Sequence, residues 1–194
     1  MKKLILIGLL FTIPLFSQLK VSWGIGAEFA KQPMTTFLGA EYPFLAGANA
    51  QMHFDLGLRS QIFLEASGNL TGRKYQSSIF TIDLAQVSYG GSIGFKYKPT
   101  RSIYFSGMVT VLNNSEERKL SFNTLNNGVY TEVKTNSTLS FGPGVGAGYL
   151  YYITNTIAID LSARYNFLIT PNGNPDRSLS TSHYLGGRLG LYFR

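Results

Sequence analysis

The sequence contains no cysteine among its 194 residues. This absence excludes disulfides, thiolate metal sites and thiol nucleophiles, and it leaves no cysteine near the N-terminus to carry a lipid anchor. Charged residues make up only 14% of the chain, and the basic excess is spread over several segments, which gives no support for nucleic-acid binding. Beyond residue 17 no apolar run reaches the roughly 20 residues that a membrane helix needs.

Glycine and aromatic residues are abundant instead, with 21 Gly, 14 Phe and 12 Tyr. Glycine favours tight turns, and aromatic residues favour pleated strands. A chain of this length suits one domain. The composition therefore favours a single all-β domain, and no cofactor-binding motif stands out in it.

The first 17 residues have the features of a secretory signal peptide. Two lysines form a positive start, an apolar stretch follows as far as Phe16, and Ser17 provides a small residue at a plausible cleavage site. The apolar stretch is shorter than the roughly 20 residues that span a bilayer as a helix. We therefore expect residues 1–17 to be an export signal and residues 18–194 to form the mature domain.

Apolar and polar residues alternate along most of the remaining chain, which is the period of a β-strand with one apolar face. From Ile157 to Ile169 every odd position is apolar, whereas most even positions are polar or charged. Residues 80–85 alternate in the opposite phase to the strand from Val87, and a bulge near Ala85 would restore the phase. Eight alternating segments are present: residues 19–29, 44–58, 61–71, 87–97, 103–112, 138–151, 157–169 and 182–193.

Strand length and connection length distinguish a membrane barrel from a secreted β-sandwich. Most of the expected strands have about 10 to 14 residues, close to the length that crosses a bilayer at a tilt and longer than usual globular strands. Short connections (59–60, 98–102 and 152–156) follow the second, fourth and sixth strands, and the others are long. Outer-membrane barrels show this pattern, with the short turns and both termini in the periplasm. The sequence thus predicts an all-β, eight-stranded antiparallel up-and-down transmembrane β-barrel in the outer membrane.

The leader, the alternating segments and the closing segment from Tyr184 to Phe193 resemble the small outer-membrane β-barrel proteins of Gram-negative bacteria, which include the OmpA membrane domain and OmpX. The resemblance implies contact with outer-membrane lipids and lipopolysaccharide, and insertion by the barrel assembly machinery. The closing strand is similar to the C-terminal signal that this machinery reads, although Arg194 displaces the aromatic residue from the last position. The residues on its apolar face are Leu185, Leu189, Leu191 and Phe193.

Alternation places charges of both signs on the inward face of the strands. Unpaired charges in a narrow lumen are costly, so we expect them to form a paired, water-bridged network that plugs the barrel. A gate in which Arg164 and Arg188 exchange carboxylate partners is the alternative, and binding of a solute is a third interpretation. The seven inward charges are Glu28, Asp55, Glu65, Asp160, Lys96, Arg164 and Arg188.

Three other features resemble chemical motifs, and each has a structural interpretation. The glycines of residues 142–148 lie two apart within a strand, so we expect them to make room for bulky lumen residues such as Tyr104 and Tyr184 rather than to bind phosphate. His183 has serines and Asp176 nearby, as a lipid-modifying enzyme would need, but alternation places it on the opposite face from Ser182. His53 lies on the inward face, and we expect it to be a hydrogen-bonded filler and not a metal ligand. No catalytic or metal site is therefore predicted.

The longest connection, residues 113–136, is rich in charged and polar side chains and is expected to continue as a hairpin beyond the membrane. Asn126, Asn127 and Gly128 provide a turn signal near its middle. Surface loops of this kind carry recognition, so an extracellular partner would bind here. The sequence accordingly favours a structural or surface-interaction role with a largely plugged lumen. A narrow porin-like channel and a lipid A-modifying enzyme are the alternative functions.

Overall fold

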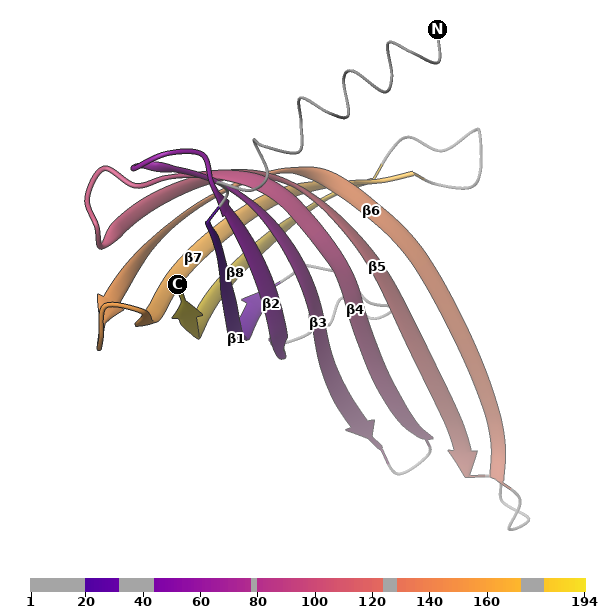
Figure 1. The fold of residues 1–194 in the computed structure, drawn as a ribbon. Coiled ribbons are helices and arrows are strands. Elements are labelled where there is room, and N and C mark those ends of the chain that lie inside the picture. Colours follow the sequence, from indigo (N-terminus) through magenta and orange to yellow (C-terminus); the bar gives the residue numbers. More distant parts are fainter. Residues whose placement is uncertain (1–19, 32–43, 78–79, 124–128, 172–179) are drawn as a thin grey trace, which may run out of the picture.

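The computed structural model describes residues 20–31, 44–77, 80–123, 129–171 and 180–194. The expected signal peptide and the turn at Gly128 lie outside these residues. The described chain forms eight β-strands and shows no helix long and apolar enough to cross a membrane. The strands, shown in Figure 1, are β1 (Val21–Lys31), β2 (Leu45–Asp55), β3 (Ser60–Gln76), β4 (Phe80–Tyr97), β5 (Ile103–Asn123), β6 (Val129–Tyr152), β7 (Ile157–Thr170) and β8 (Ser180–Phe193).

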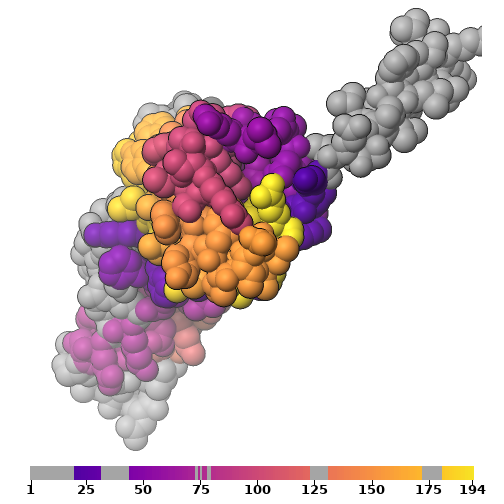
Figure 2. Space-filling view, turned by 60° about the vertical axis from the view of Figure 1, so that its left-hand side comes forward, coloured from indigo at the N-terminus to yellow at the C-terminus, as the bar shows by residue number. Residues whose placement is uncertain are grey.

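Each strand pairs antiparallel with its neighbours in sequence, and β8 pairs with β1 to close the barrel. At the closure Trp23 lies opposite Phe193, and Glu28 lies opposite Arg188. In Figure 2 the yellow C-terminal residues lie beside the indigo residues of β1, as this pairing requires. Closure removes the sheet edges within the barrel. The predicted eight-stranded antiparallel barrel is confirmed.

The outer face of the barrel is apolar, because alternation directs every second side chain outward. Trp23, Tyr149 and Tyr151 are exposed near the end that carries the short turns, and Tyr89 and Tyr165 are exposed towards the other end. Aromatic residues at both ends of an apolar band are typical of membrane barrels, where they sit at the lipid–water interfaces. Between them lie exposed aliphatic and aromatic side chains, among them Ile25, Leu64, Ile93, Phe105, Val109, Val145, Leu161, Leu189 and Leu191.

The bulge predicted near Ala85 is wrong. The register of β4 continues through this residue without a step, since Gly72 pairs with Ala85 on one side and Ala85 pairs with Glu117 on the other. Leu84 is only 7% exposed, so the apolar even positions of residues 80–85 continue the inward face of the strand. The phase of the apolar residues changes because the surroundings of the strand change. On the part of β4 that extends beyond the apolar band, the outward face has no lipid beside it, and the apolar side chains cover the inner face instead.

Strands β3 to β6 are longer than the sequence suggested, with 17, 18, 21 and 24 residues. The connections after β3 and β5, expected to be long, are therefore only residues 77–79 and 124–128. Much of the polar sequence pairs as strand, so the expectation that residues 113–136 form a hairpin is confirmed. Figure 1 shows β5 and β6 running well beyond the other strands at the lower right. We call the projecting parts, which are residues 71–76 of β3, 80–86 of β4, 113–123 of β5 and 129–140 of β6, the protruding sheet.

Two apolar clusters lie inside the barrel, one towards each end. The cluster at the short-turn end consists of Tyr104, Leu150, Ala158 and Tyr192, with Tyr152 packed against it. The cluster towards the protruding sheet consists of Ala30, Leu45, Leu112, Leu168 and Tyr184. All nine core members are at most 2% exposed. A layer of charged side chains, formed by Glu28, Glu65, Asp160, Arg164 and Arg188, lies between these two clusters.

Candidate functional site

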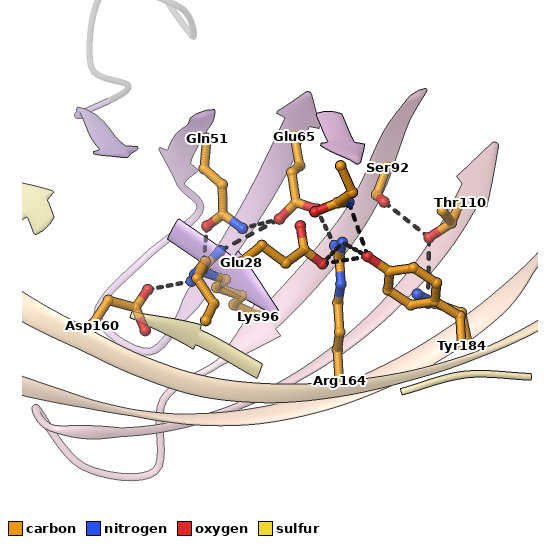
Figure 3. Close-up of polar contacts among 12 residues, drawn as sticks. Glu28, Gln51, Glu65, Ser92, Lys96, Thr110, Asp160, Arg164 and Tyr184 are labelled. Atoms are coloured by element: carbon orange, nitrogen blue, oxygen red, sulfur yellow. Dashed lines mark hydrogen bonds and ion pairs between the residues drawn. The ribbon is translucent and has the colours of Figure 1, made fainter. Parts of the chain in front are cut away.

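The charged layer of the lumen is built from inward positions of four strands. Glu28 comes from β1, Glu65 from β3, Asp160 and Arg164 from β7, and Arg188 from β8. Each side chain points inward because it occupies the polar phase of its strand. Figure 3 shows how Glu28, Glu65, Asp160 and Arg164 converge, although they come from three different strands.

Arg164 joins two carboxylates that belong to different strands. Its guanidinium forms ion pairs with Glu28 through Nη2 and with Glu65 through Nη1. The Tyr184 hydroxyl donates to Oε1 of Glu28 at 2.7 Å, and the guanidinium lies 5.3 Å from the centre of the Tyr184 ring. Side chains of Glu28 and Glu65 are 1% and 3% exposed. Arg164 thus bridges two carboxylates that are almost completely removed from solvent.

Arg188 holds the other half of the cluster. It forms an ion pair with Asp160 and lies 3.3 Å from Oε2 of Glu65. The Tyr104 hydroxyl donates to Asp160 at 2.7 Å and accepts from Nη2 of Arg188 at 3.1 Å. Glu65 is therefore shared between the two arginines, and the cluster is continuous from Glu28 to Asp160.

Lys96 is linked to the cluster without a direct ion pair among the described residues. Its ammonium donates to the Gln51 side chain at 3.0 Å, and Gln51 in turn donates to Glu65. The ammonium also lies 4.4 Å from the centre of the Tyr104 ring and 5.2 Å from that of Phe63, within the range of cation–π attraction. With Lys96 included, three carboxylates face three cations, so the layer is balanced in formal charge.

Asp55 lies apart from this cluster, although the sequence placed it in the same network. It sits at the end of β2 near the short turns, where it accepts from Gln61 and lies 4.0 Å from Arg194. The reason is its height along the barrel, since alternation defines the inward face of a strand but not the level of the residue. The other six predicted lumen charges belong to one connected layer.

Little free space remains around the charged groups. Two cavities of about 20 Å³ lie within the layer, lined among others by Glu65, Arg164 and Arg188. A cavity of this size holds about one water molecule. The charged layer is therefore nearly filled by its own side chains, and an apolar cluster adjoins it on each side.

Sequence reasoning missed the partners that complete the cluster. Tyr104 and Tyr184 were expected only as bulky lumen residues, but their hydroxyls bond to Asp160 and Glu28. Gln51 connects Lys96 to Glu65. All three side chains lie on inward faces, so alternation could have identified them as candidates. They differ from the other inward residues because each carries a hydroxyl or an amide at the same height along the barrel as a buried charge.

The glycines of residues 142–148 make room for lumen side chains, as expected. A Cβ at Gly148 would collide with the Tyr104 ring, and one at Gly144 would collide with Asn166 and press on Met108. These residues lie within strand β6 and not at a strand-to-helix junction. The glycines therefore have a packing role.

Neither histidine lies in a catalytic arrangement within the described chain. His183 is exposed on the outer face, where Nδ1 bonds the Tyr165 hydroxyl and the two rings stack with centres 5.7 Å apart. Asp176 lies outside the described residues.

His53 is fully buried, and its nitrogens have no hydrogen-bond partner in the described structure. The expectation that His53 is hydrogen-bonded is therefore wrong, and its ring packs against Phe63 and Tyr192 instead. No metal-binding group of three or more His, Asp or Glu is found among the described residues.

Comparisons of the sequence with known proteins give no family. No protein-family model matches the sequence, and no curated protein matches it either. The evidence from known proteins therefore comes from solved structures.

Several solved structures match this chain, and a major outer-membrane protein is among them. Ail, the attachment invasion locus protein of Yersinia pestis, matches with a TM-score of 0.53 and 13% identity over 89% of this chain and 96% of its own. A second Ail structure, in complex with the heparin analogue sucrose octasulfate, matches with a TM-score of 0.51 and 15% identity over 90% and 97%. A major outer-membrane protein of Thermus thermophilus matches with a TM-score of 0.53 and 12% identity over 90% and 99%. Identities this low establish the architecture alone: the chain has the fold of the small eight-stranded outer-membrane β-barrel proteins.

Proposed function

We propose that this chain is an integral outer-membrane protein whose barrel is a closed anchor and whose protruding sheet binds a partner outside the cell. The observation that carries the proposal is a free strand edge on β6. Strand β7 pairs with β6 only from Phe141 onward, opposite Ile169. Residues 129–140 pair with β5 on one side and have no strand partner on the other side among the described residues.

The free edge is long enough to hold an added strand. Twelve residues at about 3.3 Å each extend roughly 40 Å. The segment contains no proline, and its charges are Glu132 and Lys134, which pair with each other at 2.9 Å. An unprotected edge presents a row of backbone donors and acceptors, and extended peptides add to such edges by main-chain hydrogen bonds. The edge therefore suits a partner that contributes a strand.

The lumen supports an anchoring role over conduction. Five of the six charges in its central layer form ion pairs with one another, its cavities are small, and apolar clusters adjoin the charged layer on both sides. An ion would have to cross both clusters without water. A narrow channel remains the alternative function, and it requires Arg164 and Arg188 to move away from their carboxylates.

The orientation and export of the protein belong to the same proposal. We place the short turns and both termini in the periplasm, with residues 1–17 removed as a signal peptide. The assembly residues Leu185, Leu189, Leu191 and Phe193 all point outward from β8, between 36% and 59% exposed. An outward face is where the barrel assembly machinery and the membrane lipids would contact them. Lipopolysaccharide would then surround the end that carries the protruding sheet.

A proline scan of the free edge tests the proposal. Backbone N–H groups alternate in direction along an antiparallel strand, so of Val133→Pro and Lys134→Pro one removes an N–H from the free edge and leaves the β5 pairing intact. Hydrogen exchange on the folded protein identifies which amide is unprotected. Cells displaying each variant are then compared for binding to a panel of immobilised extracellular proteins.

We expect the free-edge proline to abolish binding and Lys134→Gln, which keeps the backbone donor, to retain it. Protection of alternate amides within residues 129–140 on adding the bound protein would support strand addition. Equal binding by cells whose protein lacks residues 117–135, joined by a short turn, would overturn the proposal. Unheated gel migration of each variant shows whether the barrel has folded.

A further inference from the structure

A cavity of about 400 Å³ opens at the short-turn end of the barrel, away from the protruding sheet. Its wall is formed by the turns after β2 and β4, by Tyr152 at the end of β6 and by Arg194. The backbone N–H of Lys98 donates to the carbonyl of Arg59 at 2.7 Å, which holds the two turns together. In Figure 2 the purple, pink and orange turns gather around the yellow C-terminal residues at this end.

The cavity is lined by four cations and one carboxylate. Arg59, Lys98, Arg101 and Arg194 contribute the positive charges, and Asp55 contributes the negative one. Within the described chain, the one ion pair recorded for these cations joins Arg194 and Asp55, at 4.0 Å. If that pair cancels, three positive charges remain around one cavity. The balanced layer deeper in the lumen has no such excess.

Aromatic and polar groups hold two of these cations at the cavity. The Lys98 ammonium lies 4.9 Å from the centre of the Tyr192 ring and 3.4 Å from its hydroxyl. The Arg101 guanidinium lies 4.2 Å from the centre of the Tyr152 ring. Burial lowers the pKa of the Lys98 ammonium, and Arg194 adds to this effect. An anion in the cavity would favour the charged form of Lys98 and offset the repulsion among the cations.

We propose that this cavity binds a phosphate-bearing anion. Each guanidinium group can bind two phosphate oxygens at once, and an ammonium adds a compact positive charge. Arg59, Lys98 and Arg101 together therefore suit a tetrahedral oxyanion. The volume lies in the usual range of small-ligand sites, which begins at about 300 Å³, and accommodates a phosphate with a glycerol-sized substituent. The proposal does not depend on the free edge of β6, which lies at the other end of the molecule.

Titration of the full folded protein in detergent with inorganic phosphate tests the site, followed by NMR of the backbone amides in the turns. Loss of one charge-assisted contact should weaken binding by about tenfold or more, so Lys98→Gln and Arg101→Gln should each show this loss. Lys134→Gln removes one positive charge from the protruding sheet and should bind as the wild type does. A non-saturable response, or equal weakening by Lys98→Gln, Arg101→Gln and Lys134→Gln, would overturn the proposal.

The same variants distinguish the two sources of a phosphate group. If the anion is a phospholipid headgroup of the surrounding leaflet, native mass spectrometry of protein extracted from membranes should show a retained phospholipid that is lost in Lys98→Gln. If the anion is soluble, inorganic phosphate should bind saturably without a retained lipid. Neither retained lipid nor saturable phosphate binding in the wild type would refute the site. Arg101→Gln is the second variant, because Arg101 is exposed and its replacement should leave folding intact.

Discussion

Replacing Arg164 by leucine should destabilise the barrel by leaving its two carboxylates without their shared cation. The side chains of Arg164 and Glu28 are 12% and 1% exposed. Removing one partner from a buried pair costs about 3–5 kcal/mol. Glu65 keeps Arg188 at 3.3 Å, so most of the loss falls on Glu28, which keeps the Tyr184 hydroxyl. We therefore expect Arg164→Leu to lower the free energy of unfolding by about 3 kcal/mol, at the low end of that range.

A second substitution separates this cause from general damage. Glu28→Gln removes the uncompensated charge and keeps a hydrogen-bond acceptor for Tyr184, so it should restore about half of the lost stability. Leu161→Arg, on the outer face of the same strand, should cost about 2–4 kcal/mol if it lies near the membrane midplane. Its defect comes from charge in lipid, and Glu28→Gln should not relieve it.

Urea unfolding in lipid vesicles measures these differences, with Trp23 as the fluorescent probe. It is the one tryptophan of the chain, and its side chain points outward from β1 with 52% exposed. Unfolding of Arg164→Leu at the same urea concentration as the wild type would show that the ion pair does not stabilise the barrel. Rescue of Leu161→Arg by Glu28→Gln, as well as of Arg164→Leu, would show that the rescue is independent of the pair.

Three further predictions follow from the packed lumen and the apolar outer face. In planar bilayers the wild-type protein should show conductance near the baseline, and a large steady current would contradict the closed lumen. Gly148→Leu should lower the free energy of unfolding by about 1–3 kcal/mol by overpacking against Tyr104, whereas Gly107→Ala, where a Cβ meets open space, should not; the same urea titration compares them. The folded protein should need detergent for extraction and should migrate differently on gels before and after heating, and its recovery as a water-soluble species would contradict the membrane barrel.

Alternation in the sequence determined the inner and outer faces, because the side-chain period of a strand is two wherever one face is buried. This pattern alone identified eight strands and placed Glu28, Arg164 and Arg188 inside the barrel. It misjudged residues 80–85, where the phase of the apolar residues changes while the strand itself continues unbroken. Alternation shows which face of a strand is apolar. It does not show whether lipid or water lies outside the strand, and this changes between the membrane band and the part of the strand beyond it.

Tertiary structure decided which charges meet and how far the strands extend. Glu28 lies directly opposite Arg188 in the register of β1 and β8, yet it pairs with Arg164 from β7, because long side chains in a narrow lumen converge on the centre. Among the described residues, the edge of β6 is likewise free only because β7 pairs with it no further than Phe141. Pairing depends on where the neighbouring strand ends and on the height of each residue along the barrel, and neither quantity is encoded in the local alternation of residues.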